Sequence, residues 1–267
     1  MATAAADSGD RRVSIGRIFS RAFGTIGSNP VATLGIAFLF GALPSLLLTY
    51  AAHRSGTETF AALGSAAVVG LAIFSVLVAI MLAVITQGAL VRATTAYSEG
   101  RKASFGESAI AGLRVALPLC LLGLISAVAI ALGFLLLIVP GIILYVMWSV
   151  AAPSLVEERL GPIEALRRSA DLTGGARWKI FGLTLVVVIF YWLFSALVGL
   201  LGITFYGGID AFAASTEGGI PLGYLVLNAI AGTLTSAVWG VIQTSLYVEL
   251  REWKDGPRTE ALADIFG

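Results

Sequence analysis

Long apolar stretches constrain this chain more than any motif does. A helix needs about 20 apolar residues to cross the ~30 Å hydrocarbon core of a membrane. Stretches of that length occupy approximately residues 30–52, 62–91, 115–156, 179–203 and 221–248. The third stretch is long enough for two crossings, with a reversal near "IVPG" at 138–141 or at Gly133. We therefore predict an all-α polytopic membrane protein with six transmembrane helices.

The composition supports this class and excludes others. Hydrophobic residues make up 58% of the chain, whereas soluble domains have roughly 45–50%. The net charge of +1 argues against a nucleic-acid partner, because nucleic-acid-binding domains are strongly basic. Cys120 is the only cysteine, which excludes an internal disulfide and a thiolate metal cluster. We predict no cofactor and no metal site.

The basic residues predict the orientation, because lysine and arginine are enriched on the cytoplasmic side of membrane proteins. With six spans, every one of the 17 basic residues except Arg54 lies on one side. A single helix over 115–156 would abolish this bias, so the charges support the even number of spans. We predict that both termini are cytoplasmic. We further predict a disordered cytoplasmic tail over residues 1–11, one transmembrane domain over 12–254 and a cytoplasmic C-terminal tail over 255–267.

Three charged segments beside the apolar stretches have the pattern of amphipathic helices. In "GPIEALRRSADLTGGARWKIFG" (161–182), charged residues share one arc of a helix and apolar residues the rest. Residues 14–30 and 104–114 show similar patterns, and Ser104 with Glu107 forms a capping box. We predict three interfacial helices. Each would precede two spans, in a three-unit repeat over about 12–97, 102–157 and 161–250.

The region from Pro140 to Gly182 carries a family resemblance. A span led by "PG" ends in Glu157, followed by the short "LGPIEALRRS" helix and by Trp178 entering the next span. This arrangement resembles bacterial membrane families related to the glycerophosphoryl diester phosphodiesterase membrane domain and to YciC-like proteins. The resemblance implies an integral protein of the bacterial inner (cytoplasmic) membrane. It does not imply phosphodiesterase activity, because that activity belongs to a catalytic domain fused to some members, which we do not expect within these 267 residues.

The inventory of reactive residues argues against an enzyme. A phosphodiesterase of that kind would need metal-binding carboxylates and acid/base histidines, yet His53 is the only histidine. Glu157 and Glu158 form either a metal or acid/base pair, or a charged start to the neighbouring helix, where acids are favoured by its dipole. We expect the second, and we predict no catalytic residues.

Neutral polar residues inside the spans are the other candidates. They are Gln87, Asn228 and Gln243. Such groups either join helices by hydrogen bonds or line a polar pathway. Rows of small residues four apart let helices approach closely, and they serve either packing within the chain or contact with a second copy or another membrane protein. Such rows are Ser75, Ala79 and Ala83 in the second span and Gly123, Ala127 and Ala131 in the third.

Basic residues beside the amphipathic segments are the candidate ligands of anionic lipid head groups, since each cation near an anionic leaflet is worth about 1 kcal/mol. They are Arg17, Arg21, Arg114, Arg167, Arg168, Arg177 and Lys179. We therefore predict a non-catalytic structural or lipid-associated component of the inner membrane or of a membrane complex. The alternative is a passive carrier or channel for a small neutral or amphipathic solute.

Overall fold

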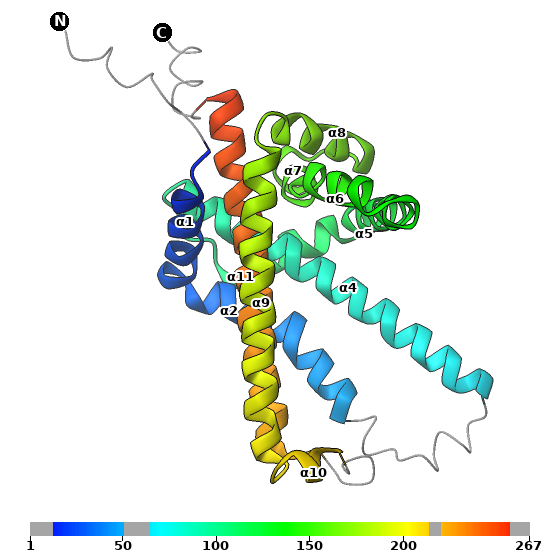
Figure 1. Ribbon diagram of the computed structural model, residues 1–267. Helices are drawn as coiled ribbons and strands as arrows, with labels where there is room; N and C mark the ends of the chain where they lie inside the picture. Colours follow the sequence, from blue (N-terminus) through cyan, green and yellow to red (C-terminus); the bar gives the residue numbers. More distant parts are fainter. Residues whose placement is uncertain (1–12, 51–64, 214–219, 257–267) are drawn as a thin grey trace, which may run out of the picture.

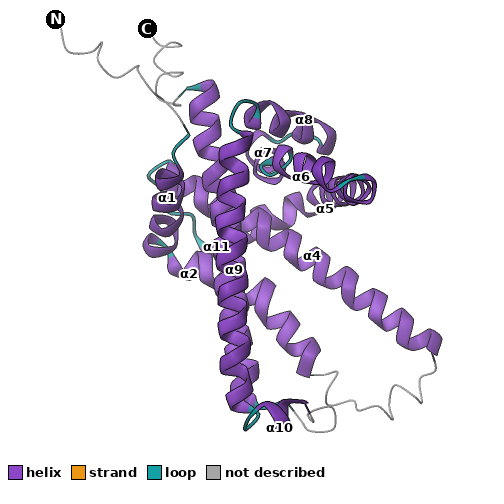
Figure 2. Ribbon diagram, viewed as in Figure 1, coloured by secondary structure: helices purple, strands orange, loops and turns teal. Residues whose placement is uncertain are grey.

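The computed structural model describes residues 13–50, 65–213 and 220–256. Within these ranges the chain is helical, with no strand (Figure 2). The predicted N-terminal tail, His53, Arg54 and nearly all of the predicted C-terminal tail lie outside the described residues. In chain order the elements are α1 (Ile15–Ser28), α2 (Pro30–Ile36), η1 (Ala37–Ala42), α4 (Ser65–Ser98), α5 (Phe105–Leu136), α6 (Ile138–Met147), α7 (Ala151–Glu158), α8 (Pro162–Thr173), α9 (Arg177–Phe205), α10 (Ile209–Ala213) and α11 (Leu222–Asp255).

Six helical segments are long and apolar enough to cross a membrane, which confirms the predicted number and identifies a multi-pass membrane protein. They are Pro30–Tyr50, Ala66–Ser98, Phe105–Leu136, Ile138–Glu158, Arg177–Phe205 and Leu222–Asp255. Several of these helices extend beyond the predicted spans at their charged ends. The added turns pack against other helices, since Ala93 and Ala96 of α4 and Leu250 of α11 are buried, and this packing stabilises them as helix.

The helix α11 is the centre of the fold. It lies beside α9 along the length of the molecule, while α4 diverges from them and α5 to α8 gather near one end (Figure 1). The apolar part of α11 is 33% buried, second to the 39% of the shorter fourth span, whereas that of α4 is 6% buried and that of α9 is 11% buried. The exposed surfaces of α4 and α9 are therefore the ones left to face lipid.

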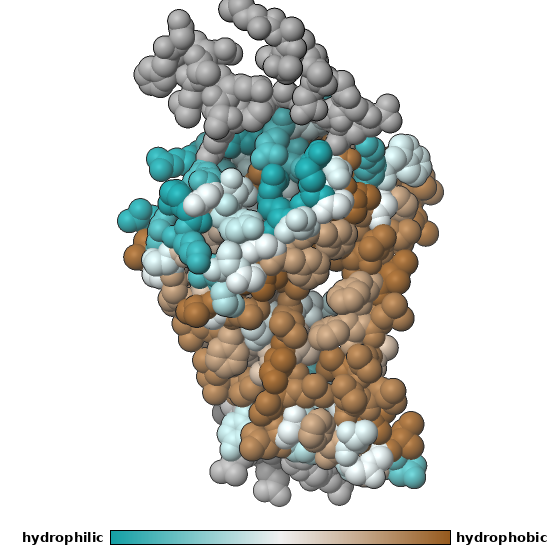
Figure 3. Space-filling view, turned by 90° about the vertical axis from the view of Figure 1, so that its left-hand side faces the viewer, coloured by the Kyte–Doolittle hydropathy of each residue, from teal (hydrophilic) through white to brown (hydrophobic). Residues whose placement is uncertain are grey.

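The charged residues gather at one end of the molecule. Figure 3 shows hydrophilic side chains at the end where the described chain begins and stops, next to a broad hydrophobic band. The main hydrophobic core lies toward this end and includes Ile18, Leu90, Leu172 and Tyr247, which are fully buried. Elements that are far apart in sequence are thus held together at the charged end, which we call the basic end.

The reversal within 115–156 occurs at Leu137, beside the predicted "IVPG". Leu137 has extended backbone angles (φ −160°, ψ 147°) between α5 and α6. Just before and after it, the two helices touch at glycines: a Cβ on Gly133 would lie 3.0 Å from the Cα of Gly141. The two glycines allow the antiparallel helices to approach closely.

Two of the three amphipathic segments form separate helices, α1 and α8. The third does not, because residues 105–114 are the first turns of the unbroken helix α5. Ser104 caps this helix as predicted, accepting a hydrogen bond from the backbone N–H of Glu107 at 3.1 Å. The apolar face of α8 is covered by protein, since Ala165 and Leu166 are buried in a cluster with α5 and α7.

The fourth span is broken, which the hydropathy pattern did not indicate. It consists of α6 and α7 with a turn between them, and Pro153 follows this turn and has no N–H to continue the helical bonds. The fully buried Ser169 of α8 donates to the carbonyl oxygen of Met147 (2.8 Å) and accepts from the N–H of Val150 (3.3 Å). The segment after the fourth span therefore satisfies the backbone groups that the break leaves free.

Candidate functional site

The two central glutamines meet between α4 and α11. Gln87 Nε2 donates a hydrogen bond to Gln243 Oε1 at 2.8 Å. This bond satisfies the amide nitrogen of Gln87 and the amide oxygen of Gln243. The Oε1 atom of Gln87 and the Nε2 atom of Gln243 have no hydrogen bond within the described part of the chain. The hydrogen bond joins α4 to α11, which is the first of the two roles predicted for these residues, and each amide keeps one group without a partner in the described chain.

The glutamine pair borders a cavity of about 390 Å³, which we call the α5 cavity. Its walls come from α4, α5, α6, α11 and the start of α7 with the turn before it. The polar groups around it include Tyr145, Trp148 and Ser126, and the apolar ones include Ile80 and Leu122. This volume is within the range of small-molecule sites, which are mostly apolar with a few convergent polar groups.

Gln87 also borders a second cavity, of about 360 Å³, which we call the η1 cavity. It lies between the first span, α4 and α11, and Phe40 and Gly41 of the π-helix line it together with Pro44. Pro44 cannot donate a helical hydrogen bond, which favours the wider turn just before it. Short π-helical segments occur frequently at functional sites.

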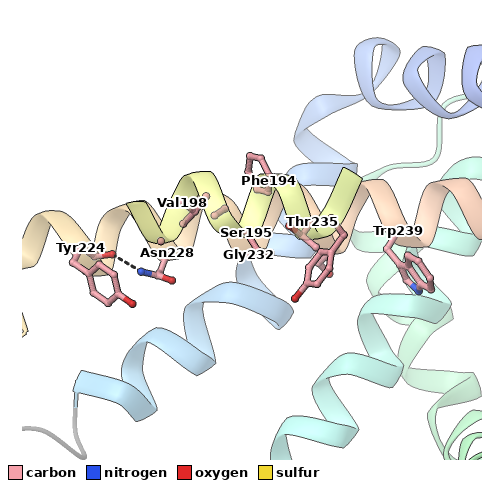
Figure 4. Close-up of a pocket in the computed structure, with 12 residues that line it drawn as sticks. Phe194, Ser195, Val198, Tyr224, Asn228, Gly232, Thr235 and Trp239 are labelled. Carbon is pink, nitrogen blue, oxygen red and sulfur yellow. Dashed lines mark hydrogen bonds between the residues drawn. The ribbon is translucent and has the colours of Figure 1, made fainter. Parts of the chain in front are cut away.

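The third predicted polar residue, Asn228, borders a cavity of about 530 Å³ between α9 and α11, the α9 cavity. Tyr224, Asn228 and Trp239 project from α11 toward the same side, which faces the first span (Figure 4). The Nδ2 atom of Asn228 donates to the carbonyl oxygen of Tyr224 at 3.0 Å. All three intramembrane polar residues chosen from the sequence thus border cavities.

The three cavities adjoin one another. Ala83 and Gln87 line both the α5 cavity and the η1 cavity. Ser236 and Trp239 line both the η1 cavity and the α9 cavity. A single row of cavities therefore follows α11.

Sequence reasoning had not identified the aromatic members of this row. Residues 224, 228, 232, 235, 239 and 243 line the cavities and are spaced by three or four along α11. This spacing places them on one face of a helix. The signal was present, but a face of tyrosine, tryptophan and glycine reads as ordinary helix packing until a cavity is found beside it.

Carboxylates of α11 tie the amphipathic helix α1 to the basic end. Glu249, which is 2% exposed, accepts hydrogen bonds from Arg17 Nη2 (2.6 Å), Arg17 Nε (2.9 Å) and the N–H of Ser14 (2.9 Å). This hydrogen bonding raises the pKa of the Arg17 guanidinium above its ordinary value. Arg21 pairs with Glu252 at 3.0 Å.

A second charged cluster joins α7, α8 and α11. Arg168 pairs with Glu158 at 2.9 Å and with Asp255. The hydroxyl of Tyr247 donates to Glu158 at 3.0 Å, and Thr95 donates to Glu157 at 2.8 Å. In the described ranges no group of three or more His, Cys, Asp or Glu is placed to hold a metal ion.

The structure thus divides the predicted head-group residues into two sets. Arg17, Arg21 and Arg168 are engaged by carboxylates of the chain itself. The others have exposed side chains and no ion pair within the described residues; they are Arg114, Arg167, Arg177 and Lys179. The Lys179 ammonium donates to the carbonyl oxygen of Val13 at 3.3 Å, so Arg114, Arg167 and Arg177 are the least engaged.

Comparison with known proteins places the chain in a family. A family model described as a domain of unknown function (DUF7847) matches residues 100–250, which is more than half of the 267 residues. The match contains Asn228, Gln243 and the broken fourth span, and Gln87 lies before it. Searches of curated proteins and of solved structures found no match. The chain therefore belongs to the DUF7847 family.

Proposed function

We propose that this protein is a non-catalytic membrane component that binds lipids within the bilayer. The observation that carries the proposal is the Gln87–Gln243 pair, whose free amide groups border cavities with mostly apolar walls. An amphipathic molecule suits such a site, because its polar part would pair with the amides while its chain replaces the apolar contacts. A hydrocarbon alone would leave the amides unpaired.

The basic end supports a second point of lipid contact. Arg114, Arg167 and Arg177 are exposed and free of ion pairs in the described chain, and Trp178, next to Arg177, is 86% exposed. Tryptophan and arginine at this level are typical of residues that meet lipid head groups. We propose that this end faces the cytoplasmic leaflet of a bacterial inner membrane, with both termini cytoplasmic.

In the same proposal α1 and α8 lie at the membrane interface. On α1, Ile18 and Ala22 are buried against the protein, while Phe23 is 59% exposed and is left to contact lipid. On α8, Ile163 is exposed in the same way. The three-unit repeat stays a prediction, and so does the relation to the glycerophosphoryl diester phosphodiesterase membrane-domain and YciC-like families.

The test of intramembrane binding is native mass spectrometry of the full chain extracted in membrane discs. We expect lipid to stay bound at a fixed ratio to the wild type, and to be largely lost from Gln87→Leu and Gln243→Leu. The matched control is Ser75→Leu on α4, because the Ser75 hydroxyl donates only to the carbonyl of Ala72 and Ser75 lines none of the three cavities. Equal retention by all four proteins would refute the proposed site.

The same spectra test the basic end. Replacing Arg114, Arg167 and Arg177 together by alanine should reduce the share of anionic lipid that copurifies, without removing the lipid held by the glutamines. A stoichiometric protein in the spectra would instead identify a membrane-protein partner, and a mass of two or more chains a homo-oligomer. Anionic lipid in the bulk proportion for both proteins would count against head-group binding.

The alternative function, a passive carrier or channel for a small neutral or amphipathic solute, is favoured by one observation. The cavities border all three intramembrane polar residues, and they adjoin one another through shared lining residues. Uptake of a neutral solute into proteoliposomes would test this function directly. Uptake equal to that of protein-free vesicles would argue against it.

A further inference from the structure

The row of cavities along α11 is almost as long as the membrane is thick. It runs from Tyr224, in the α9 cavity, to Gln243, in the α5 cavity. At 1.5 Å per residue these two positions are about 28 Å apart along the helix axis, close to the ~30 Å of the hydrocarbon core. Polar groups are therefore available at successive depths across most of the bilayer.

The lining residues of this row are polar without being charged. None of the residues that line the three cavities is Asp, Glu, Lys, Arg or His. Amides, hydroxyls and an indole ring follow one another along α11, at Asn228, Thr235, Ser236, Trp239 and Gln243. A charged head group would find no countercharge there and would lose its hydration, which is expensive in a membrane.

Several of these groups have unused hydrogen-bonding capacity. The indole N–H groups of Trp148 and Trp239 and the hydroxyl of Tyr145 make no hydrogen bond to the described part of the chain. Tyrosine and tryptophan hydrogen-bond through their polar atoms when buried. A ligand with several hydroxyl groups would satisfy these donors and the free amide groups, and its ring faces would stack on the aromatic side chains.

We propose that this protein lets lipids with an uncharged, polyhydroxylated head group, such as neutral glycolipids, cross between the two leaflets along α11. The inference rests on the lipid binding proposed above and adds movement and a head-group class to it. The sugar would move from the Gln87–Gln243 amides past Ser236 and Trp239 to Asn228. The chains would remain in the bilayer beside the exposed apolar faces of α4 and α9. The lipid moves down its own concentration gradient between the leaflets, so the movement requires no energy source.

Ala83 offers a way to obstruct the row without disturbing the fold. Ala83 lines both the α5 cavity and the η1 cavity. Because Ala83 is exposed, a larger side chain there does not have to displace buried neighbours. Ala83→Phe therefore adds a ring where the two cavities adjoin. Ala72→Phe is the matched control, because Ala72 is an exposed alanine of the same helix that lines none of the three cavities.

The experiment uses proteoliposomes of the full chain with a glucosyl lipid labelled on its acyl chain by nitrobenzoxadiazole. Dithionite added outside quenches only the label in the outer leaflet, so slow loss of the remainder reports movement between leaflets. We expect the wild type and Ala72→Phe to accelerate this loss over protein-free vesicles. Ala83→Phe should be slower by about tenfold, equivalent to ~1.4 kcal/mol on the barrier. Equal rates for the two phenylalanine variants would overturn the proposed route.

Two further results separate this inference from the proposed function. If the wild type retains lipid in native mass spectrometry but does not accelerate the loss of label, movement between leaflets is refuted and lipid binding stands. If neither is seen, both fail. The same assay with labelled phosphatidylglycerol tests the head-group class: movement as fast as that of the glucosyl lipid would overturn the preference for uncharged heads.

Discussion

Gly112 of α5 lies directly against the backbone of α4, and replacing it by alanine tests the packing of these two helices. An ideal Cβ on Gly112 would lie 2.4 Å from the carbonyl oxygen of Ile85 and 3.0 Å from the backbone nitrogen of Ala89. Both are backbone atoms of α4, so no side-chain rotation relieves the contact. The two helices must separate by about 1 Å to reach an ordinary van der Waals distance.

The expected cost follows from this geometry. Overpacking of this kind destabilises by about 1–3 kcal/mol, while the gain in helix propensity from glycine to alanine offsets up to ~1 kcal/mol. Gly123→Ala, in the same helix, has the propensity gain alone, because a Cβ there meets no atom within 4 Å. The difference in unfolding free energy between the two variants therefore isolates the steric cost, at about 1–3 kcal/mol.

The measurement is unfolding of the full chain in detergent micelles by titration with sodium dodecyl sulfate, followed by the fluorescence of its five tryptophans. Gly112→Ala should unfold at a lower concentration than the wild type, and Gly123→Ala at the same or a higher one. Equal midpoints for the two variants would refute the close approach of α4 and α5 at Gly112.

Two further predictions concern the charged end and the broken span. A double-mutant cycle of Arg17→Ala and Glu249→Ala should give a coupling energy of about 1–3 kcal/mol. This lies between the values for exposed and for buried ion pairs, because Glu249 is buried and Arg17 is 60% exposed. A coupling energy near zero would contradict the observed pair. Ser169→Ala should destabilise by about 1–3 kcal/mol, because the N–H of Val150 loses its partner and the carbonyl of Met147 keeps only the longer bond from Thr173 at 3.3 Å. Ser98→Ala is its control, since the Ser98 hydroxyl bonds only within its own helix, and similar unfolding midpoints for these two variants would show that Ser169 does not support the break.

The membrane class and the number of spans could be predicted from the sequence. Apolar length is a local property, and a bilayer demands about 20 such residues for each crossing whatever the rest of the chain does. The reversal within 115–156 was also predictable, because a stretch of that length exceeds one crossing and Leu137 lies beside the expected "IVPG". The cap at Ser104 was predictable because capping is also a local property: the side chain of a cap bonds to a backbone N–H within four residues of itself.

Partners distant in sequence could not be predicted in this way. Arg17 and Arg21 have the pattern of cations facing a membrane surface, but they pair with Glu249 and Glu252, more than 200 residues away. The row of small residues expected to bring span three close to its neighbours included Gly123, which faces open space, whereas the close approach is at Gly112. Which face of an apolar helix meets another helix depends on the packing of all the helices, and hydropathy is nearly the same on every face.

For the candidate site, the sequence by itself identified the three neutral polar residues within the spans, since an amide in an apolar helix stands out in any context. Only the tertiary structure decided what they do together. It joined Gln87 to Gln243 across two helices and left each with a free amide group beside a cavity. It also aligned Asn228 with them along α11. A cavity is space that several helices leave unfilled between them, and no single segment of a sequence contains that information.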